Sequence, residues 1–124
     1  MKNHVLKSIA KLFFGAFLLM SSFAFSQTQT EKYFVSGNCG MCKNRIETTA
    51  KKSGADAANW DSETKILEVE YNSAKTSKEE ILKKIAEAGH DNELFRASDE
   101  VYENLPGCCH YDRKISEKSI NKND

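Results

Sequence analysis

The clearest hydrophobic pattern in the chain lies over residues 65–71. Leu67, Val69 and Tyr71 alternate with two glutamates, as in a strand that has one buried and one solvated face. Residues 55–60 give a weaker strand pattern, because two polar side chains interrupt the apolar positions. The two segments are separated by a polar turn, so we expect neighbouring strands.

Two shorter runs predict the outer strands of the same sheet. The first covers residues 32–35 and follows a polar leader at residues 27–31. The second covers residues 93–96, close to the end of the patterned region.

Between the strands, the apolar positions follow a helical period. From Cys42 they recur at Ile46 and Ala50, and Gly54 is a plausible helix stop. A second helix begins at a capping box, in which Ser77 and Glu80 exchange hydrogen bonds with each other's backbone. Its apolar stripe comprises Ile81, Leu82, Ile85 and Ala86, and Gly89 ends it.

The order of elements is therefore strand, helix, strand, strand, helix, strand. This split pattern predicts an α+β fold, a ferredoxin-like βαββαβ sandwich over residues 27–98. Residues 99–104 fit a short helical turn, and a Leu-Pro-Gly sequence interrupts it. The extension, residues 99–124, carries a Cys-Cys-His sequence, and we expect its charged end from residue 112 to be disordered.

The first 26 residues have the composition of a signal peptide. Three lysines precede an apolar core over residues 12–20, and small residues at Ala24 and Ser26 favour cleavage before Gln27. The alternative is an uncleaved N-terminal anchor. We expect export, so that the protein is periplasmic or secreted.

Removal of residues 1–26 changes the charge balance of the chain. The sequence has 18 lysines and arginines and 18 acids. The segment takes three lysines and no acid, which leaves 15 basic residues against 18 acidic ones and a net charge of −3. A chain of this charge has no basic surface for nucleic acid.

The chemistry centres on Cys39 and Cys42, which lie three positions apart between the first strand and the first helix. Two thiols at this spacing can bind one ion or form a disulfide. The helix N-terminus favours the thiolate, which is both the metal ligand and the nucleophile. The spacing alone leaves both soft-metal binding and redox exchange open.

The sequence Cys39-Gly40-Met41-Cys42-Lys43-Asn44-Arg45-Ile46-Glu47 resembles the metal loop and first helix of the heavy-metal-associated domain. That family includes copper chaperones, modules of copper-pumping ATPases and periplasmic mercury-binding proteins. The resemblance covers about residues 31–98. The loop departs from the family pattern, since Asn38 alone stands where the family has Met-Thr before the first cysteine.

The resemblance implies a metal-binding protein, not an enzyme, with Cys39 and Cys42 as the primary ligands. Cu(I) is the best match for two thiolates, and Hg(II) and Zn(II) are the alternatives. The implied partner is an envelope metal transporter or efflux pump that receives the ion by thiolate exchange. We expect a monomer, or a dimer bridged by metal.

Further candidate ligands lie outside the metal loop. Cys108, Cys109 and His110 predict a second soft-metal site or additional ligands for the first. Alternatively, one of these cysteines forms a structural disulfide with the loop, which export permits. His90 follows Gly89, at a position where some bacterial copper chaperones of the family place a histidine near the metal.

The competing hypothesis is a small thiol–disulfide oxidoreductase that uses the same Cys-x-x-Cys. Against it, the sequence has one proline, Pro106, and no strand pattern follows it, whereas the thioredoxin-like fold needs a proline opposite the dithiol.

Overall fold

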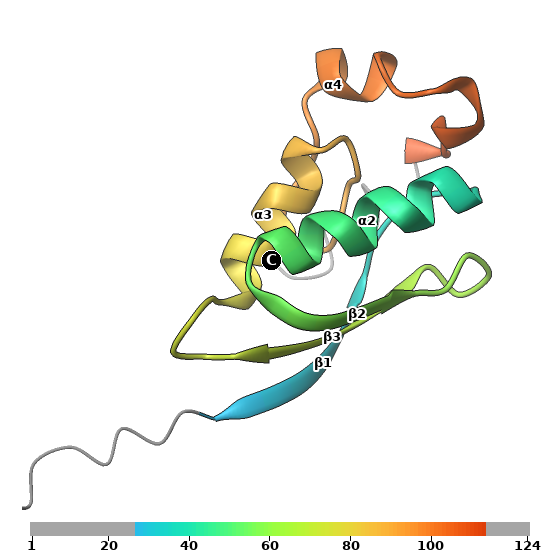
Figure 1. The fold of residues 1–124 in the computed structure, drawn as a ribbon. Coiled ribbons are helices and arrows are strands. Elements are labelled where there is room, and N and C mark those ends of the chain that lie inside the picture. Colours follow the sequence, from blue (N-terminus) through green and yellow to red (C-terminus); the bar gives the residue numbers. More distant parts are fainter. Residues whose placement is uncertain (1–26, 114–124) are drawn as a thin grey trace, which may run out of the picture.

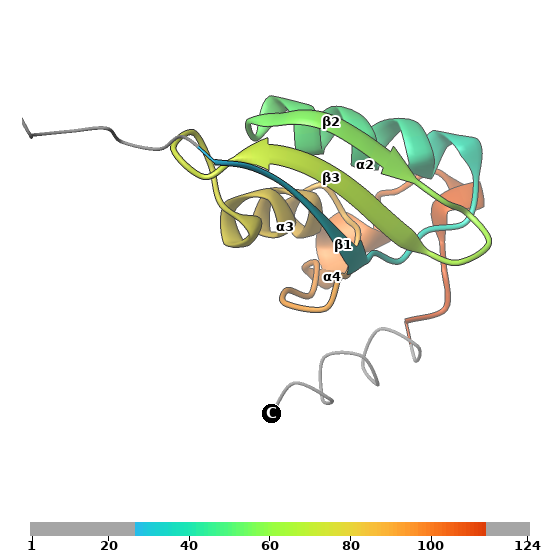
Figure 2. The ribbon, with the colours of Figure 1, turned by 90° about the horizontal axis from the view of Figure 1, so that it is seen from below.

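One three-stranded antiparallel sheet and two helices form the body of the protein (Figure 1). The structure is a computed structural model, and it describes residues 27–113. The elements of the body are β1 (Thr28–Phe34), α2 (Gly40–Lys52), β2 (Ala55–Trp60), β3 (Ile66–Asn72) and α3 (Lys78–Glu87). The strand order is β1-β3-β2, and both helices cover the same face of the sheet, as Figure 2 shows from below.

The alternating pattern of the third strand is confirmed. Leu67, Val69 and Tyr71 are buried under the helices, whereas the glutamates between them face solvent. The weaker prediction for residues 55–60 is also confirmed as β2, which pairs with β3 from Trp60↔Leu67 to Ala55↔Tyr71. Its polar side chains are tolerated because Asp56 is exposed.

The predicted polar leader at residues 27–31 is wrong for most of its length. β1 begins at Thr28, and the whole strand pairs with β3, from Thr28↔Asn72 to Phe34↔Ile66. The pairing depends on backbone groups, so a polar sequence can extend the strand where its side chains alternate on a partly open surface. Lys32 and Glu68 also form a cross-strand ion pair of 3.1 Å.

The predicted final strand at residues 93–96 is also wrong. Its place is taken by an isolated bridge between Val35 and Asn92. The Asn92 side-chain oxygen accepts hydrogen bonds from the backbone N–H groups of Leu94 and Phe95, at 3.2 and 3.0 Å. The Asn92 N–H donates to the Phe95 carbonyl. These bonds fold the chain into a turn, so it cannot continue along β1.

Local signals set the helix boundaries much as predicted. The Ser77 hydroxyl caps α3 by accepting from the Glu80 backbone N–H at 3.2 Å. Gly54 and Gly89 follow the two helices with φ angles of 105° and 111°, which glycine adopts without strain. Within residues 27–113, no helix has the length and apolar character needed to cross a membrane.

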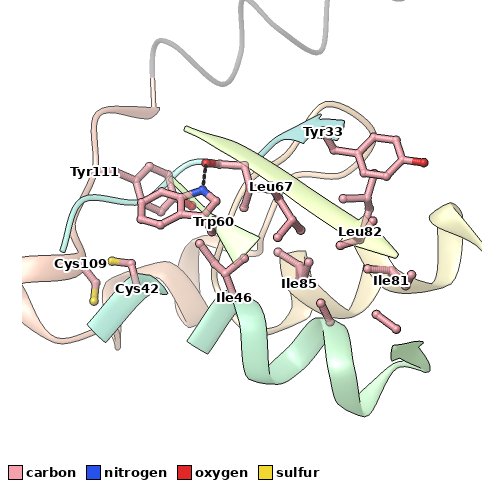
Figure 3. Packing of buried hydrophobic residues seen from close by; sticks show 14 of the residues in the cluster. Tyr33, Cys42, Ile46, Trp60, Leu67, Ile81, Leu82, Ile85, Cys109 and Tyr111 are labelled. Carbon is pink, nitrogen blue, oxygen red and sulfur yellow. Dashed lines mark hydrogen bonds between the residues drawn. The ribbon is translucent and has the colours of Figure 1, made fainter. Parts of the chain in front are cut away.

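The core lies between the sheet and the two helices, and Figure 3 shows its packing. Trp60 is its largest fully buried side chain, and its indole N–H donates to the Val35 carbonyl at 3.0 Å. The predicted core positions on α2, α3 and β3 are confirmed as buried, whereas Phe95 is half-buried against the cluster.

The C-terminal segment packs on this body instead of leaving it. It comprises α4 (Asp99–Glu103) and a 3-10 turn, η1 (Gly107–Cys109), which contacts α2. Leu105, Cys109 and Tyr111 are part of the core cluster. The expectation of disorder from residue 112 is wrong for Arg113, which pairs with buried Asp91. Residues 114–124 and the predicted signal peptide lie outside the described residues.

Candidate metal centre

The metal loop, the segment that carries Cys39 and leads to Cys42, lies where the chain turns from β1 into α2. Cys39 is the residue before α2, with an extended backbone, and its carbonyl accepts from the Lys43 N–H at 3.0 Å. Cys42 belongs to the first turn of the helix and is fully buried. The helix start thus fixes the spacing of the two sulfurs, which lie 3.6 Å apart.

All four cysteines of the chain gather at this helix end, and all are free thiols. The Cys39 Sγ lies 2.7 Å from the Cys108 Sγ and 3.5 Å from the Cys109 Sγ, in addition to its contact with Cys42. Cys108 and Cys109 are 3.9 Å apart. The sulfurs of Cys39, Cys108 and Cys109 all lie within 4.8 Å of one another, which is a spacing that can hold one ion.

The C-terminal segment reaches the metal loop because several contacts hold it there. The Asn38 amide donates to the His110 carbonyl at 3.2 Å. The Tyr111 hydroxyl donates to the Gly89 carbonyl at 2.7 Å and accepts from the Asp91 N–H at 2.9 Å. Figure 3 shows Cys42 and Cys109 close together at one end of the core.

The charge on the cluster is concentrated on Cys39. A hydrogen bond from the Cys108 thiol lowers the pKa of Cys39 to about 6, and the Cys42 backbone amide adds to the effect. The same hydrogen bond raises the pKa of Cys108, which therefore acts as the donor. At neutral pH, Cys39 is the thiolate of the pair and the first ligand available to a soft cation.

Burial keeps the thiols of Cys42 and Cys109 protonated until a bound cation replaces the proton. It raises the pKa of Cys42 to about 11 and also raises that of Cys109. Arg45 partly offsets the cost at Cys109, since its Nη1 donates to the Cys109 sulfur at 3.4 Å. A bound soft cation would supply the positive charge that these buried thiolates need.

His90 does not belong to the sulfur cluster found among residues 27–113. Its side chain is fully buried, and its Nδ1–H donates to the Ser36 carbonyl at 2.8 Å. The other ring nitrogen lies 3.4 Å from Arg45 Nη1, so it is the acceptor of a neutral imidazole. Burial lowers the pKa of His90 to about 4.

The low pKa of His90 predicts a loss of stability in acid. In the unfolded chain His90 binds a proton near pH 6.5, whereas in the folded protein it binds one only near pH 4. The free energy of unfolding therefore falls as the pH drops through this window. Between pH 7.5 and pH 5 the free energy of unfolding should fall by about 2 kcal/mol from this residue. Urea unfolding of wild type and His90→Gln at both pH values measures it. An equal fall in both proteins would contradict the prediction.

His110 is also absent from the cluster formed by described residues. Its side chain is exposed, and its ring packs against Tyr102 at 5.2 Å between centroids. The structure therefore brings together the four cysteines among the six predicted ligands. Cys39, Cys108 and Cys109 have a spacing that can hold one ion, and Cys42 joins them through its 3.6 Å contact with Cys39, whereas both histidines lie apart.

Gly37 allows the metal loop to lie directly against the core. A Cβ at this position would lie 3.0 Å from the Trp60 ring and 3.1 Å from the Cys42 Cβ. Gly37→Ala should therefore lower the free energy of unfolding by about 1–2 kcal/mol through overpacking. The matched control is Gly40→Ala, since a Cβ there meets nothing within 4 Å. Equal urea midpoints for the two variants would show that the close contact is unimportant.

The ion pair that anchors the C-terminal segment was missed by sequence reasoning. Arg113 donates to both oxygens of Asp91, from Nε at 2.9 Å and from Nη2 at 2.8 Å. The signal available in advance was weak: an arginine soon after a Cys-Cys-His sequence, in a stretch of charged residues.

Comparison with known proteins gives matches to metal-binding domains. Residues 33–91 match the family model of the heavy-metal-associated domain. A candidate copper-ion-binding protein from Bacillus anthracis is 25% identical, with a TM-score of 0.51, and the match covers 54% of this chain and 97% of that one. No curated protein matches the chain.

A second solved structure is the N-terminal domain of a potential copper-translocating P-type ATPase from Bacillus subtilis, in its Cu(I)-loaded state. It is also 25% identical with a TM-score of 0.51, and the match covers 60% of this chain and 96% of that domain. The family match runs from Tyr33, near the end of β1, to Asp91 and includes the first two cysteines, whereas Cys108 and Cys109 lie beyond it. Residues 33–91 are therefore similar to the heavy-metal-associated domain, and the chain shares its fold with solved copper-binding domains.

Proposed function

We propose that this protein binds Cu(I) through a thiolate cluster and delivers or sequesters the ion in the cell envelope. The observation that carries the proposal is the position of Cys39, whose sulfur lies within 3.6 Å of the sulfurs of Cys42, Cys108 and Cys109. Cys39 and Cys42 are the primary ligands, and the C-terminal pair supplies one or two more.

The donor set limits the choice of ion. Thiolates favour Cu(I), Hg(II) and Zn(II) over Mg²⁺ or Ca²⁺. Zn–S bonds of about 2.3 Å in a tetrahedron require sulfurs about 3.8 Å apart, so four cysteines would also suit zinc. Cu(I) is preferred because the two solved relatives are a candidate copper-ion-binding protein and a Cu(I)-loaded ATPase domain.

The envelope role is supported by the first 26 residues, whose basic start and apolar core are typical of a signal peptide. An envelope metal transporter or efflux pump is the corresponding partner. Since this chain supplies its own third and fourth sulfurs, it can complete the site as a monomer, without ligands from a second copy.

Competition with a Cu(I) chelator tests the proposal. The protein, reduced under anaerobic conditions, should take one Cu(I) per chain from bathocuproine disulfonate and hold it more tightly than a variant that lacks both Cys39 and Cys42. If the wild type takes no copper from the chelator, or if the double variant holds it equally well, the proposed function is wrong.

A further inference from the structure

The four sulfurs differ in their access to solvent. Cys42 and Cys109 are fully buried, Cys39 is half-buried, and Cys108 is exposed. Because Cys108 lies 2.7 Å from Cys39, it connects the interior of the cluster to the surface. An ion held by the buried sulfurs would meet an incoming ligand on the Cys108 side.

A fifth sulfur, that of Met41, lies beside exposed Cys108. The Met41 side chain is 52% exposed, although it is large and apolar, and among residues 27–113 only Leu94 is also an exposed large hydrophobic residue. The Met41 Sδ lies 3.7 Å from the Cys108 Sγ. Core packing does not explain this position, because the side chain is in solvent at the first turn of α2.

The chemistry of a thioether suits a transfer ligand. Methionine sulfur is a soft, neutral donor that selects Cu(I), whereas zinc sites are built from cysteine, histidine and carboxylate ligands. Being neutral, it requires no loss of a proton and binds more weakly than a thiolate. It can therefore hold copper briefly at the surface without competing with the inner thiolates for the resting ion.

We propose that Cys108 Sγ and Met41 Sδ form an outer sulfur pair through which Cu(I) enters and leaves the inner thiolates. The proposal rests on the proposed function, and it assigns a route within that site. In this route Cys108 is the ligand that exchanges and Met41 is the ligand at the surface. Cys39 binds the ion in both its inner and its outer position.

The transfer is a ligand exchange with no change in oxidation state. As copper moves outward, bonds form to Cys108 and Met41, and the bond to Cys42 breaks. The Cys108 proton leaves to solvent, and Cys42 takes up a proton from solvent. A soft donor of the acceptor then replaces Met41, which is the weakest bond. Copper remains Cu(I) throughout, so no oxidant or reductant is required.

Stopped-flow transfer of Cu(I) from the loaded protein to bathocuproine disulfonate tests the proposal. Met41→Leu keeps the size and helix propensity of the side chain but removes its sulfur. The transfer rate should fall about tenfold, at the low end of the roughly 10- to 100-fold losses seen when residues that support a metal site are removed, and the Cu(I) dissociation constant should change less than the rate. Asn44→Ala is the matched control on the exposed surface of the same helix, and it should transfer at the wild-type rate.

The rate of zinc release distinguishes a role of Met41 as a copper ligand from a role in packing. Zn(II) loaded into the same proteins and removed by a zinc chelator should leave wild type and Met41→Leu at equal rates. Wild-type copper transfer in Met41→Leu, or equal slowing for both metals, would overturn the outer pair. Failure of wild type to take up Cu(I) would instead overturn the proposed function, so the two failures are distinguishable.

Discussion

Cys39→Ser is expected to lower the affinity for Cu(I) by about 100-fold or more. Structural zinc sites with four cysteine or histidine ligands bind their metal with roughly 10–16 kcal/mol, and on this scale one of four ligands corresponds to about 3 kcal/mol. Removal of the Cys39 sulfur should cost at least this much binding free energy. This sulfur contacts the other three cysteine sulfurs, and its pKa of about 6 makes it the thiolate at neutral pH. Chelator competition on the reduced variant measures the loss.

The matched control for this prediction is Cys108→Ser. Cys108 is exposed and lies beyond the matched family region, so its removal should cost clearly less equilibrium affinity than that of Cys39. Near-UV circular dichroism of buried Trp60 verifies that both variants are folded. Equal losses for the two serine variants would mean that Cys39 and Cys108 contribute equally to binding, which would contradict the distinction between primary and additional ligands.

Arg113→Ala is expected to lower the free energy of unfolding by about 3–5 kcal/mol, the usual cost of leaving a buried charge without its partner. Asp91 is fully buried, and the Arg113 side chain is only 13% exposed. The guanidinium donates to both carboxylate oxygens and also to the Ala97 carbonyl at 2.7 Å. Urea unfolding followed by Trp60 fluorescence measures the change.

Arg96→Ala serves as the matched control, since Arg96 lies 4.0 Å from the same carboxylate but is 38% exposed. An exposed ion pair contributes about 0–1 kcal/mol, so this variant should remain close to wild type. The Arg113 variant should also have faster alkylation of Cys109, because the C-terminal segment loses its anchor. Similar small losses in both variants would show that the segment is held mainly by its apolar contacts.

The sequence predicted most of the fold because the periodic segments coincide with the buried positions. Leu67 and Val69 on β3, and Ile81 and Ile85 on α3, are all in the core as expected. The predicted strand at residues 93–96 failed for a local reason, since short apolar runs do not reveal that the Asn92 side chain will bind the backbone ahead of it.

The candidate site was predicted in part. The Cys-x-x-Cys spacing and the Cys-Cys-His sequence singled out the four cysteines that the structure brings together. The sequence could not decide whether the two pairs meet, because that depends on long-range contacts such as Tyr111 with Gly89. The sequence could not show that His90 is buried and donates to the Ser36 carbonyl, because both depend on packing; its role as a ligand stays a prediction.

Native mass spectrometry of the protein purified from its native cells, with differential alkylation of its thiols, tests Cu(I) binding by the thiolate cluster most directly. We expect one copper ion per chain, with Cys39, Cys42 and at least one of Cys108 and Cys109 protected by the ion. A metal-free protein two hydrogens lighter, with Cys39 bonded to Cys42, would contradict copper binding and favour the thiol–disulfide oxidoreductase.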